Sequence, residues 1–470
     1  MTETTKSTPK THEAEISNEA RATLTKSDAF TAYMSSHWEN LPVSEPSEAE
    51  VAPYAAKRRA VLSAAFPGKR LVIPAGILKQ RANDTNYVFR ANTAFSHLTG
   101  WGSDAEPGAV LVFDPIEEAA NDGASHRVTL YSLAPAGRGS TEFFDRADIG
   151  EFWVGPRPSL QHISKHLGIN TADLSEFVAG DDDLGLEDAE LSRVLAEMRL
   201  VKDEYEVREM QAAVDATALG FDDVVENLPR AIEHARGERI VDGVFHARAR
   251  LEGHWVGYET IAASGAHACV LHWGANNGPV NAGDLLLLDA GVEVDSLYTA
   301  DITRTLPVSG EFSPLQRKIY QAVYDAAEAA FAAAKPGVKF HEVHDAALAV
   351  IEERVREWGL IPAEPNPDVP FHKRFMIHGT CHHLGIDVHD CAEARREMYY
   401  DGVLEEGMVF TIEPGLYFHP GDATVPEEYW GIGVRIEDDV VVTKDGVRNL
   451  SADIPRTADA VEAWVKTGKR

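Results

Sequence analysis

The run LLLLDAG occupies residues 285–291, and ADITRT follows it at residues 300–305. Asp289 ends the four-leucine run, a pattern that is typical of a buried strand meeting a site. A carboxylate there is costly to bury unless a cation or hydrogen bonds compensate its charge. Asp301 begins a segment of alternating character that puts Thr303 on the same face, so the Thr303 hydroxyl is expected to orient the Asp301 carboxylate. The alternative for either aspartate alone is a turn-forming residue at a strand end.

Two further acidic motifs lie on short apolar or alternating segments, TIEPGLY at residues 411–417 and GVRIEDD at residues 433–439. In the second motif, period-two alternation puts Arg435 and Glu437 on one face and two apolar residues on the other. A buried face that carries a carboxylate requires a counter-ion. Glu413 is followed by a proline, which fixes the turn after it. A surface glutamate is the alternative for each motif taken alone.

Histidines are concentrated in HGTCHHLGIDVHD at residues 378–390, which holds four of the chain's 19: His378, His382, His383 and His389. Imidazole is the side chain best suited to metal binding and proton transfer near neutral pH. A helical zinc pair formed by His378 and His382, as in HExxH enzymes, fails because Gly379 occupies the position of the required glutamate. Ordinary structural histidines are the alternative for the isolated cluster.

Taken jointly, these motifs predict a metal centre. Four carboxylates and one imidazole supply four negative charges, which would neutralise two divalent cations: Asp289, Asp301, Glu413, Glu437 and His382. Ligation that is mostly by oxygen favours manganese or another hard ion. Two such ions can hold a hydroxide at neutral pH, polarise a carbonyl and stabilise an oxyanion, which is hydrolytic chemistry.

Helical and strand patterns divide the chain into two halves. Apolar or alternating runs predict strands at 71–74, 109–113, 128–133, 285–289, 410–413 and 433–443, and helical patterns predict helices at 55–65, in two pieces from 188 to 228, from 313 to 336 and from 341 to 358. Ser313 and Gln316 form a capping-box pattern around Pro314. We therefore expect an α/β N-terminal domain followed by an α+β catalytic half.

The predicted domain boundaries follow from changes in composition. Residues 1–45 are rich in Thr, Ser, Glu and Lys, so we expect a flexible N-terminal arm with a short helix near Phe30 to His37. An N-terminal domain is predicted at 46–187 and the catalytic domain at 188–470.

The composition is that of an ordinary globular protein with a strongly acidic surface. The 470 residues include 44 Lys and Arg against 75 Asp and Glu, for a formal net charge of −31. Such a surface repels phosphate backbones and anionic lipids, so neither nucleic acid nor membrane is an expected partner. The three cysteines lack disulfide or zinc spacing, and no signal-like start or long apolar run is present, which predicts a cytoplasmic protein.

In their order along the chain, the motifs of residues 200–460 resemble the pita-bread metallopeptidases (peptidase M24B), a family that includes prolidase and Xaa-Pro aminopeptidase, also called aminopeptidase P. The segments YVFRANTAF at 87–95 and LTGW at 98–101 are similar to the N-terminal domain of the creatinase, prolidase and aminopeptidase P enzymes. Methionine aminopeptidases generally lack that domain. The resemblance implies a pita-bread (creatinase/aminopeptidase-like) catalytic domain and Xaa-Pro aminopeptidase activity.

By position, the resemblance implies the role of each metal ligand. Asp301 and Glu437 would bridge two divalent ions, His382 and Glu413 would complete one site, and Asp289 would chelate the other. A metal-bridging hydroxide would attack the Xaa-Pro carbonyl and release the N-terminal residue.

The resemblance also implies roles for the surrounding side chains. Glu413 would shuttle the proton, while His272 and His389 would face the substrate and stabilise the tetrahedral intermediate. Three more residues are implied as substrate-binding or supporting groups: His378, Tyr417 and Arg435. The partners implied are a peptide with an N-terminal Xaa-Pro sequence and further copies of the chain, as a homodimer or homotetramer.

Other activities remain open or are excluded by the same motifs. Prolidase, which hydrolyses Xaa-Pro dipeptides by the same chemistry, is the closest alternative. A non-catalytic binding protein on this fold is a second, although such proteins usually lose metal ligands and none is missing here. Creatinases share the fold without using metal, so the five retained ligands argue against that reaction.

Overall fold

The computed structural model describes residues 27–39, 46–83, 85–116, 125–364 and 366–470. The described residues form two compact units, one built from 27–39 and 134–159 and the other from 46–133 and 160–470. Most of the predicted N-terminal arm, residues 1–26 and 40–45, lies outside the described residues. Within 27–39, helix α1 (Asp28–Met34) begins at Ser27, whose hydroxyl accepts a hydrogen bond from the Phe30 N–H. The three predicted domain ranges stay predictions.

The smaller unit is held together by aromatic side chains. Besides α1 it contains two short helices, α4 (Glu142–Asp145) and α5 (Glu151–Val154). Phe30 meets Phe144 edge to face at 5.8 Å between ring centroids, and Trp38 meets Phe143 in the same way at 5.4 Å. These contacts join segments that are about a hundred positions apart in the sequence.

The larger unit begins with a mixed four-stranded sheet in the order β1-β4-β5-β6, in which β5 and β6 are parallel and the other pairs antiparallel. Its strands are β1 (Leu71–Pro74), β4 (Val110–Pro115), β5 (His126–Ser132) and β6 (Asn170–Asp173), and its helices are α2 (Ala52–Ala65), α3 (Thr93–Thr99) and α6 (Leu160–Leu167). A short hairpin is made by β2 (Gln80–Ala82) and β3 (Thr85–Asn86). Apolar residues of the predicted strands fill the core between sheet and helices. The predicted α/β character is confirmed.

Three helices lead into the catalytic half: α7 (Ala189–Glu197), α8 (Glu204–Ile232) and α9 (Gly237–Glu252). The two helices predicted between residues 188 and 228 are thus confirmed as α7 and α8. Helix α8 begins with a capping box, in which Asp203 accepts from the Glu206 N–H and Glu206 accepts from the Asp203 N–H.

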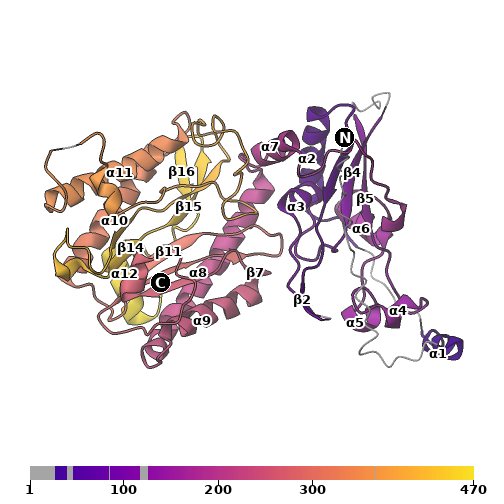
Figure 1. Cartoon of the computed structure of the whole chain (residues 1–470), viewed down its shortest axis with the longest axis horizontal. Coiled ribbons are helices and arrows are strands. Elements are labelled where there is room, and N and C mark those ends of the chain that lie inside the picture. The colour runs from indigo at the N-terminus through magenta and orange to yellow at the C-terminus, as the bar shows by residue number, and fades with distance from the viewer. Residues whose placement is uncertain (1–26, 40–45, 84, 117–124, 365) are drawn as a thin grey trace, which may run out of the picture. The chain divides into compact units, whose positions relative to one another are not determined.

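The catalytic half is a set of small antiparallel sheets covered by two helix pairs (Figure 1). Its strands are β7 (Trp255–Val256), β8 (Ile261–Ser264), β9 (Leu285–Ala290), β10 (Val292–Glu293), β11 (Ile302–Pro307), β12 (Val409–Ile412), β13 (Gly415–Phe418), β14 (Ile432–Arg435), β15 (Asp438–Thr443) and β16 (Gly446–Asn449). Helices α8 and α9 pack against β7, β8 and β10, while α10 (Pro314–Ala333) and α11 (Phe340–Glu357) pair with each other and α10 packs against β12, β13 and β14. The sheets meet where β14 lies beside β9 and β11.

The predicted helix starts and strand positions are largely confirmed, with one correction. The Ser313 capping box is present, and α10 has Pro314 in its first turn. The strand predicted at 433–443 is instead two strands, β14 and β15, interrupted at residues 436 and 437. The break has a physical cause, because the Glu437 N–H donates to the Thr303 carbonyl rather than to a neighbour in its own sheet.

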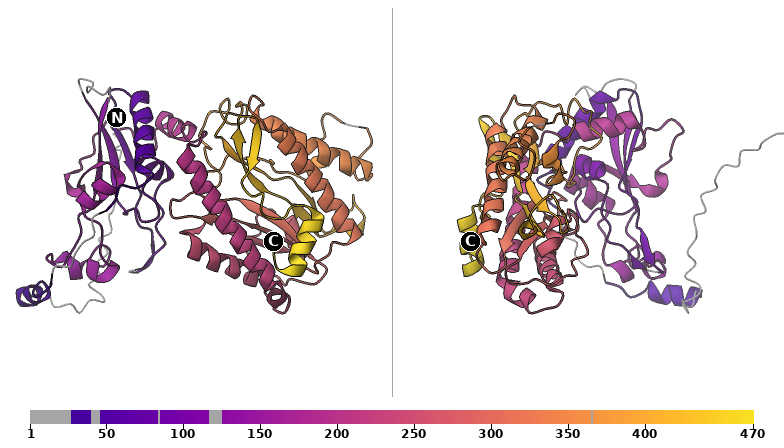
Figure 2. Two further views of the ribbon diagram at one scale, coloured as in Figure 1. Left: turned by 180° about the vertical axis from the view of Figure 1, so that it is seen from behind. Right: turned by 60° about the vertical axis from the view of Figure 1, so that its left-hand side comes forward.

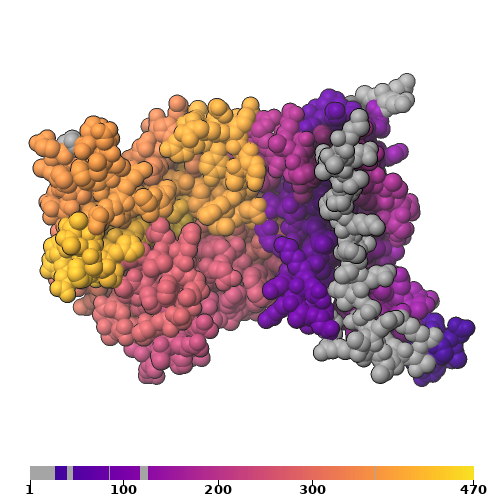
Figure 3. All heavy atoms as spheres, viewed as in Figure 1, coloured from indigo at the N-terminus to yellow at the C-terminus, as the bar shows by residue number. Residues whose placement is uncertain are grey.

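The C-terminal helix α12 (Ala458–Thr467) packs on β11, α8 and α10. Figure 2 shows α12 in yellow at the front of the catalytic half in the view from behind, whereas Figure 3 shows the opposite face of that half, where orange segments lie above pink ones. Trp464 anchors α12, since the indole is buried and its N–H donates to Asp222. In the part of the chain that the structure describes, no helix combines the length and apolar character that crossing a membrane requires.

A buried ion-pair cluster at the start of α8 makes stability depend on pH. The Glu206 carboxylate accepts from the Tyr298 hydroxyl at 2.8 Å and lies 3.5 Å from the Arg58 guanidinium and 3.4 Å from the His97 ring. Burial alone would raise the pKa of Glu206, but His97 and Arg58 outweigh it and hold that pKa well below the ordinary 4.5.

We expect Glu206→Gln to destabilise the protein at pH 7 by about 3 kcal/mol, because a buried ion pair loses one partner. A carboxylate whose pKa is depressed by folding stabilises the fold above its unfolded pKa and loses that contribution as the pH falls. The difference in thermal midpoint between wild type and variant should therefore shrink below about pH 4.5. Glu204→Gln, which changes an exposed residue in the same helical turn, is the control. A difference that stays constant from pH 7 to pH 3 would contradict the prediction.

Candidate metal centre

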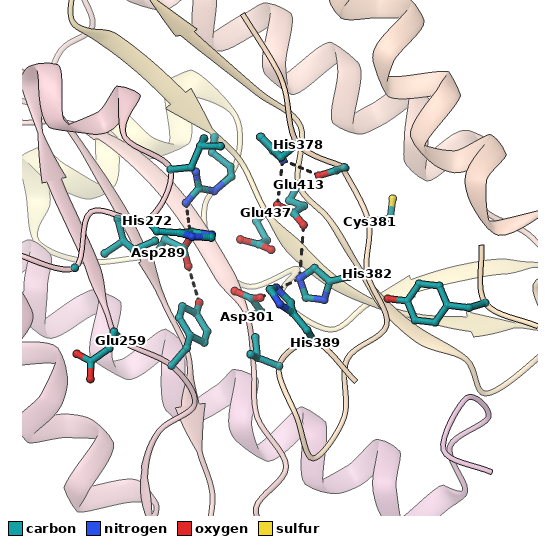
Figure 4. A pocket seen from close by; sticks show the side chains of 18 residues that line it. Glu259, His272, Asp289, Asp301, His378, Cys381, His382, His389, Glu413 and Glu437 are labelled. Carbon is teal, nitrogen blue, oxygen red and sulfur yellow. Dashed lines mark hydrogen bonds and ion pairs between the residues drawn. The ribbon is translucent and has the colours of Figure 1, made fainter. Parts of the chain in front are cut away.

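The carboxylates and histidines singled out in the sequence line one cavity of about 520 Å³ in the catalytic half. Figure 4 shows their side chains pointing into it from strands and loops that are distant in the sequence. The predicted site residues among its lining are His272, Asp289, Asp301, His378, His382, His389, Glu413, Arg435 and Glu437. Tyr417 contacts the His378 ring but lines a smaller neighbouring pocket.

Two antiparallel strands position the aspartates. Asp289 is the fifth residue of β9, where it pairs with Thr303 of β11 on one side and Ile261 of β8 on the other. Asp301 directly precedes β11, and its backbone N–H donates to the Asp439 carboxylate at 3.0 Å. Because strands lie on both sides of Asp289, the residue is buried, with 7% of its surface exposed, and it lines the cavity.

Of the other three candidate ligands, Glu413 and Glu437 lie at the ends of strands and His382 lies in a loop beside β12. Glu413 follows β12, and its N–H donates to the Thr380 carbonyl. Glu437 lies in the break between β14 and β15, with 2% of its surface exposed. His382 is held on the edge of β12 by two hydrogen bonds with Thr411, one through the Thr411 hydroxyl and one through its backbone N–H.

Oxygen and nitrogen atoms of these residues form overlapping groups, and within each group the atoms lie within 4.8 Å of one another. One group contains Asp289, Asp301 and Glu437; a second contains His382, Glu413 and Glu437; a third joins His389 to Asp301 and His382. Glu437 belongs to the first and second of these ligand groups, and Asp301 belongs to the first and third. An oxygen-rich donor set with one or two imidazoles suits divalent cations.

The electrostatics of the cluster favour positive charge. Burial and the charges of Asp301 and Glu413 raise the pKa of Glu437 well above its ordinary value. Burial also raises the pKa of Glu413 to about 7. For His382, burial acts to lower the pKa, but the contact with Asp301 and the charge of Glu413 raise it to about 9. The raised pKa values show that the negative charges of these carboxylates repel one another, and a bound cation would relieve that repulsion. The residues present therefore fit the divalent ions that the donor set implies.

A chain of hydrogen bonds through Arg435 and Tyr417 connects Asp289 to His378. The buried Arg435 guanidinium pairs with Asp289 and donates to the Tyr417 hydroxyl at 3.0 Å and to the Thr303 hydroxyl at 3.1 Å. The Tyr417 hydroxyl in turn lies 2.8 Å from Nε2 of His378. Burial and the nearby Arg435 charge lower the pKa of His378 to about 4, so its ring is neutral.

One sequence expectation about this network is wrong. The Thr303 hydroxyl donates to Glu437 at 2.6 Å and not to Asp301. Alternation along a single strand correctly put Thr303 toward the site. It could not show that Glu437, from another sheet, lies closer to the hydroxyl.

The histidines expected to face the substrate lie on the open side of the cavity. His272 and His389 are both exposed, and both line it. The His389 ring meets the His382 ring edge to face at 4.4 Å. Burial and the His382 charge lower the pKa of His389.

Several residues of the site were missed by sequence reasoning. The Tyr258 hydroxyl donates to Asp289 at 2.6 Å, and Asp439 accepts from the Asp301 backbone. Tyr399 lines the cavity and its hydroxyl accepts from the His383 N–H. Asp439 could have been suspected, since two aspartates directly follow Glu437 inside a strand pattern. Neither tyrosine stands in a sequence context that marks it.

Comparison with known proteins identifies the family that has this combination of domains. Residues 208–444 match the model of metallopeptidase family M24, and residues 54–179 match the aminopeptidase P N-terminal domain. The chain belongs to metallopeptidase family M24. As a member of that family it is a hydrolytic enzyme, and the predicted pita-bread catalytic domain with an aminopeptidase P-type N-terminal domain is confirmed.

Named M24 relatives and solved structures cover nearly the whole chain. It is 50% identical to Xaa-Pro aminopeptidase 1 of Streptomyces coelicolor over 93% of this chain and 92% of that one, and 30% identical to the Xaa-Pro aminopeptidase of Escherichia coli over 88% and 97%. The fold is similar to Pseudomonas aeruginosa aminopeptidase PepP, with a TM-score of 0.74 and 29% identity over 89% of this chain and 98% of that chain. It is also similar to zinc-substituted E. coli aminopeptidase P in complex with product, with a TM-score of 0.73 and 28% identity over 91% and 100%.

Proposed function

We propose that this M24 enzyme removes the N-terminal residue from peptides that have proline in the second position. The observation that carries the proposal is the convergence of five candidate ligands and two exposed histidines, His272 and His389, in one cavity. The relatives named Xaa-Pro aminopeptidase, which match over most of the chain, supply the substrate class.

In this proposal two divalent ions, with manganese preferred because oxygen donors dominate, are held by the ligand set defined above: Asp289, Asp301, His382, Glu413 and Glu437. When bound, such ions make water a nucleophile at neutral pH and polarise the scissile carbonyl. Asp301 and Glu437 would each help to hold both ions, and each belongs to two of the ligand groups, as does His382.

Glu413 is proposed to move the proton during the reaction. Its Oε2 lies 3.6 Å from Nδ1 of His378 and its Oε1 lies 3.6 Å from Nε2 of His382, so the carboxylate projects into the cavity between two rings. Glu413 would take a proton from the attacking water and deliver it to the proline nitrogen as the Xaa-Pro bond breaks. Without that delivery the nitrogen would leave as an unstable anion.

His272 and His389 are proposed to contact the peptide itself. Both stand at the open side of the cavity, where ring N–H groups can donate to the scissile carbonyl and to the oxyanion that develops from it. His378, Tyr417 and Arg435 would hold Asp289 and the cavity wall in place through the hydrogen-bond chain already described.

Prolidase activity is the alternative, and peptide length separates the two. We expect Ala-Pro-Ala to be cleaved with a kcat/KM at least about tenfold higher than that of Ala-Pro, since an aminopeptidase gains binding energy from residues beyond proline. Ala-Ala-Ala, which lacks the tertiary amide, is the control for the proline requirement. Liquid chromatography of the released alanine measures all three. A preference for the dipeptide would establish the prolidase reaction instead.

The state of the cysteines is the basis for a proposed cellular location. Cys269, Cys381 and Cys391 are free thiols, as expected in a reducing compartment, so we propose a cytoplasmic location. A homodimer or homotetramer stays a prediction, as does the exclusion of nucleic acid and membrane as partners.

A further inference from the structure

His272 lies on a segment that has little regular structure to hold it. Residues 265–284 connect β8 to β9, and within them a single short 3₁₀ helix, η3 (Gly265–Cys269), precedes the histidine. The Gly274 N–H donates to the His272 carbonyl, which makes a tight turn at this point. The His272 side chain is exposed. A side chain on such a loop needs an anchor elsewhere if it is to keep one position.

A buried carboxylate provides that anchor. Glu238, the second residue of α9, is completely buried. Its Oε1 accepts from the Ser264 N–H at 2.9 Å and from Nδ1 of His267 at 2.7 Å. Its Oε2 accepts from the Trp273 indole N–H at 2.9 Å and from the Gly278 N–H at 2.6 Å. The four donors lie on both sides of His272 in the sequence.

Packing around the carboxylate is tight. The His267 and Trp273 rings stack with centroids 3.8 Å apart, so both indole face and indole N–H are fixed. A Cβ on Gly278 would come within 2.9 Å of Glu238 Oε2 and 2.7 Å of the His267 ring, so a larger residue would displace the loop. The Gly278 carbonyl also accepts from the Glu238 backbone N–H. Hydrogen bonds to a charged group are stronger than those between neutral groups. Four of them to one buried carboxylate therefore hold the loop firmly against the start of α9.

We propose that Glu238 is a positioning residue, which holds the Ser264–Gly278 loop so that His272 faces the reacting carbonyl. Glu238 is not among the residues that line the cavity, and it would therefore act through Trp273, the neighbour of His272. The proposal rests on the substrate-contacting role of His272 in the proposed function.

The test is a double-mutant cycle between Glu238→Gln and His272→Ala. An amide presents a donor where the carboxylate presented an acceptor, so two of the four N–H groups lose their partner. Glu238→Gln should lower kcat/KM for Ala-Pro-Ala roughly 10- to 100-fold, as expected for a displaced catalytic contact. In the His272→Ala background the same change should have no further effect, because the group it positions is gone. Metal content should remain that of the wild type throughout.

Glu206→Gln is the matched control, since it also removes a buried carboxylate but one that does not contact the loop. It should lower the thermal midpoint and leave kcat/KM unchanged. Hydrogen exchange gives a readout that does not depend on turnover: amides of residues 264–278 should exchange faster in Glu238→Gln and not in Glu206→Gln. If Glu238→Gln fails to fold, Trp273→Phe, which keeps the aromatic ring and removes one donor, should show the same non-additivity with a smaller loss.

The possible failures are distinguishable. A Glu238→Gln enzyme with wild-type kcat/KM, or one whose loss is equally large in the His272→Ala background, would overturn the positioning role while leaving the proposed function intact. Normal turnover in His272→Ala would instead overturn the role of His272 in the proposed function and the catalytic part of this proposal together.

Discussion

Replacing Glu413 by glutamine is expected to lower kcat for Ala-Pro-Ala by about 10³-fold, within the range for loss of a general acid or base. The carboxylate lies between His378 and His382 in the cavity, with one oxygen 3.6 Å from each ring. Glutamine has nearly the same shape and keeps an oxygen that can bind a cation. It cannot carry the proton, so kcat should fall much more than KM changes.

Glu405→Gln is the control for this experiment, because it changes an exposed glutamate on the same segment. Metal content of each variant, measured by elemental analysis, separates a chemical defect from lost metal. A metal-replete Glu413→Gln enzyme whose kcat is within tenfold of the wild type would refute the proton-transfer role.

Removing divalent metal with a chelator is expected to abolish turnover and to lower thermal stability, and adding Mn²⁺ should restore both. Three of the four carboxylates of the proposed centre are buried and Glu413 is half-buried, and Arg435 forms an ion pair with only one of the four, Asp289. A cation that binds the folded state stabilises it by about 4 kcal/mol when its free concentration is 1,000 times Kd. The thermal midpoint should therefore rise with the concentration of Mn²⁺.

Glu437→Gln provides the internal comparison. The carboxylate of Glu437 lies close to those of Asp301 and Glu413, so the three negative charges repel one another. Replacing Glu437 by glutamine should relieve that repulsion in the metal-free protein and weaken cation binding. The metal-free variant should match or exceed the metal-free wild type in thermal midpoint, and its midpoint should respond much less to Mn²⁺. Turnover that survives exhaustive chelation would contradict the metal-centred mechanism.

Much of the fold was predictable from local patterns because those patterns act through the chain itself. The Ser313 capping box and the four-leucine run before Asp289 depend on hydrogen bonds and burial within a few residues, and both are found as predicted. The family motifs likewise placed the five candidate ligands in one site, as their convergence in the cavity now shows.

Prediction was weaker where a residue's partner comes from a different sheet. Thr303 was expected to orient Asp301 and instead donates to Glu437, and the strand predicted at 433–443 is broken at Glu437. Tyr258, which donates to Asp289, had no sequence signal at all. In each case the deciding contact joins segments whose spacing along the chain carries no information about their distance in space.

Sequence by itself determined the residue types of the centre, the strands and helix starts that carry them, and the resemblance that the comparisons confirm. Only the tertiary structure decided which candidate metal ligands lie beside Glu437 and that Arg435 pairs with Asp289. It also decided that Glu238 accepts four hydrogen bonds from the loop that carries His272. The reason is physical: local propensity acts over a few residues, whereas a buried charge is satisfied by whichever groups the packed sheets bring to it.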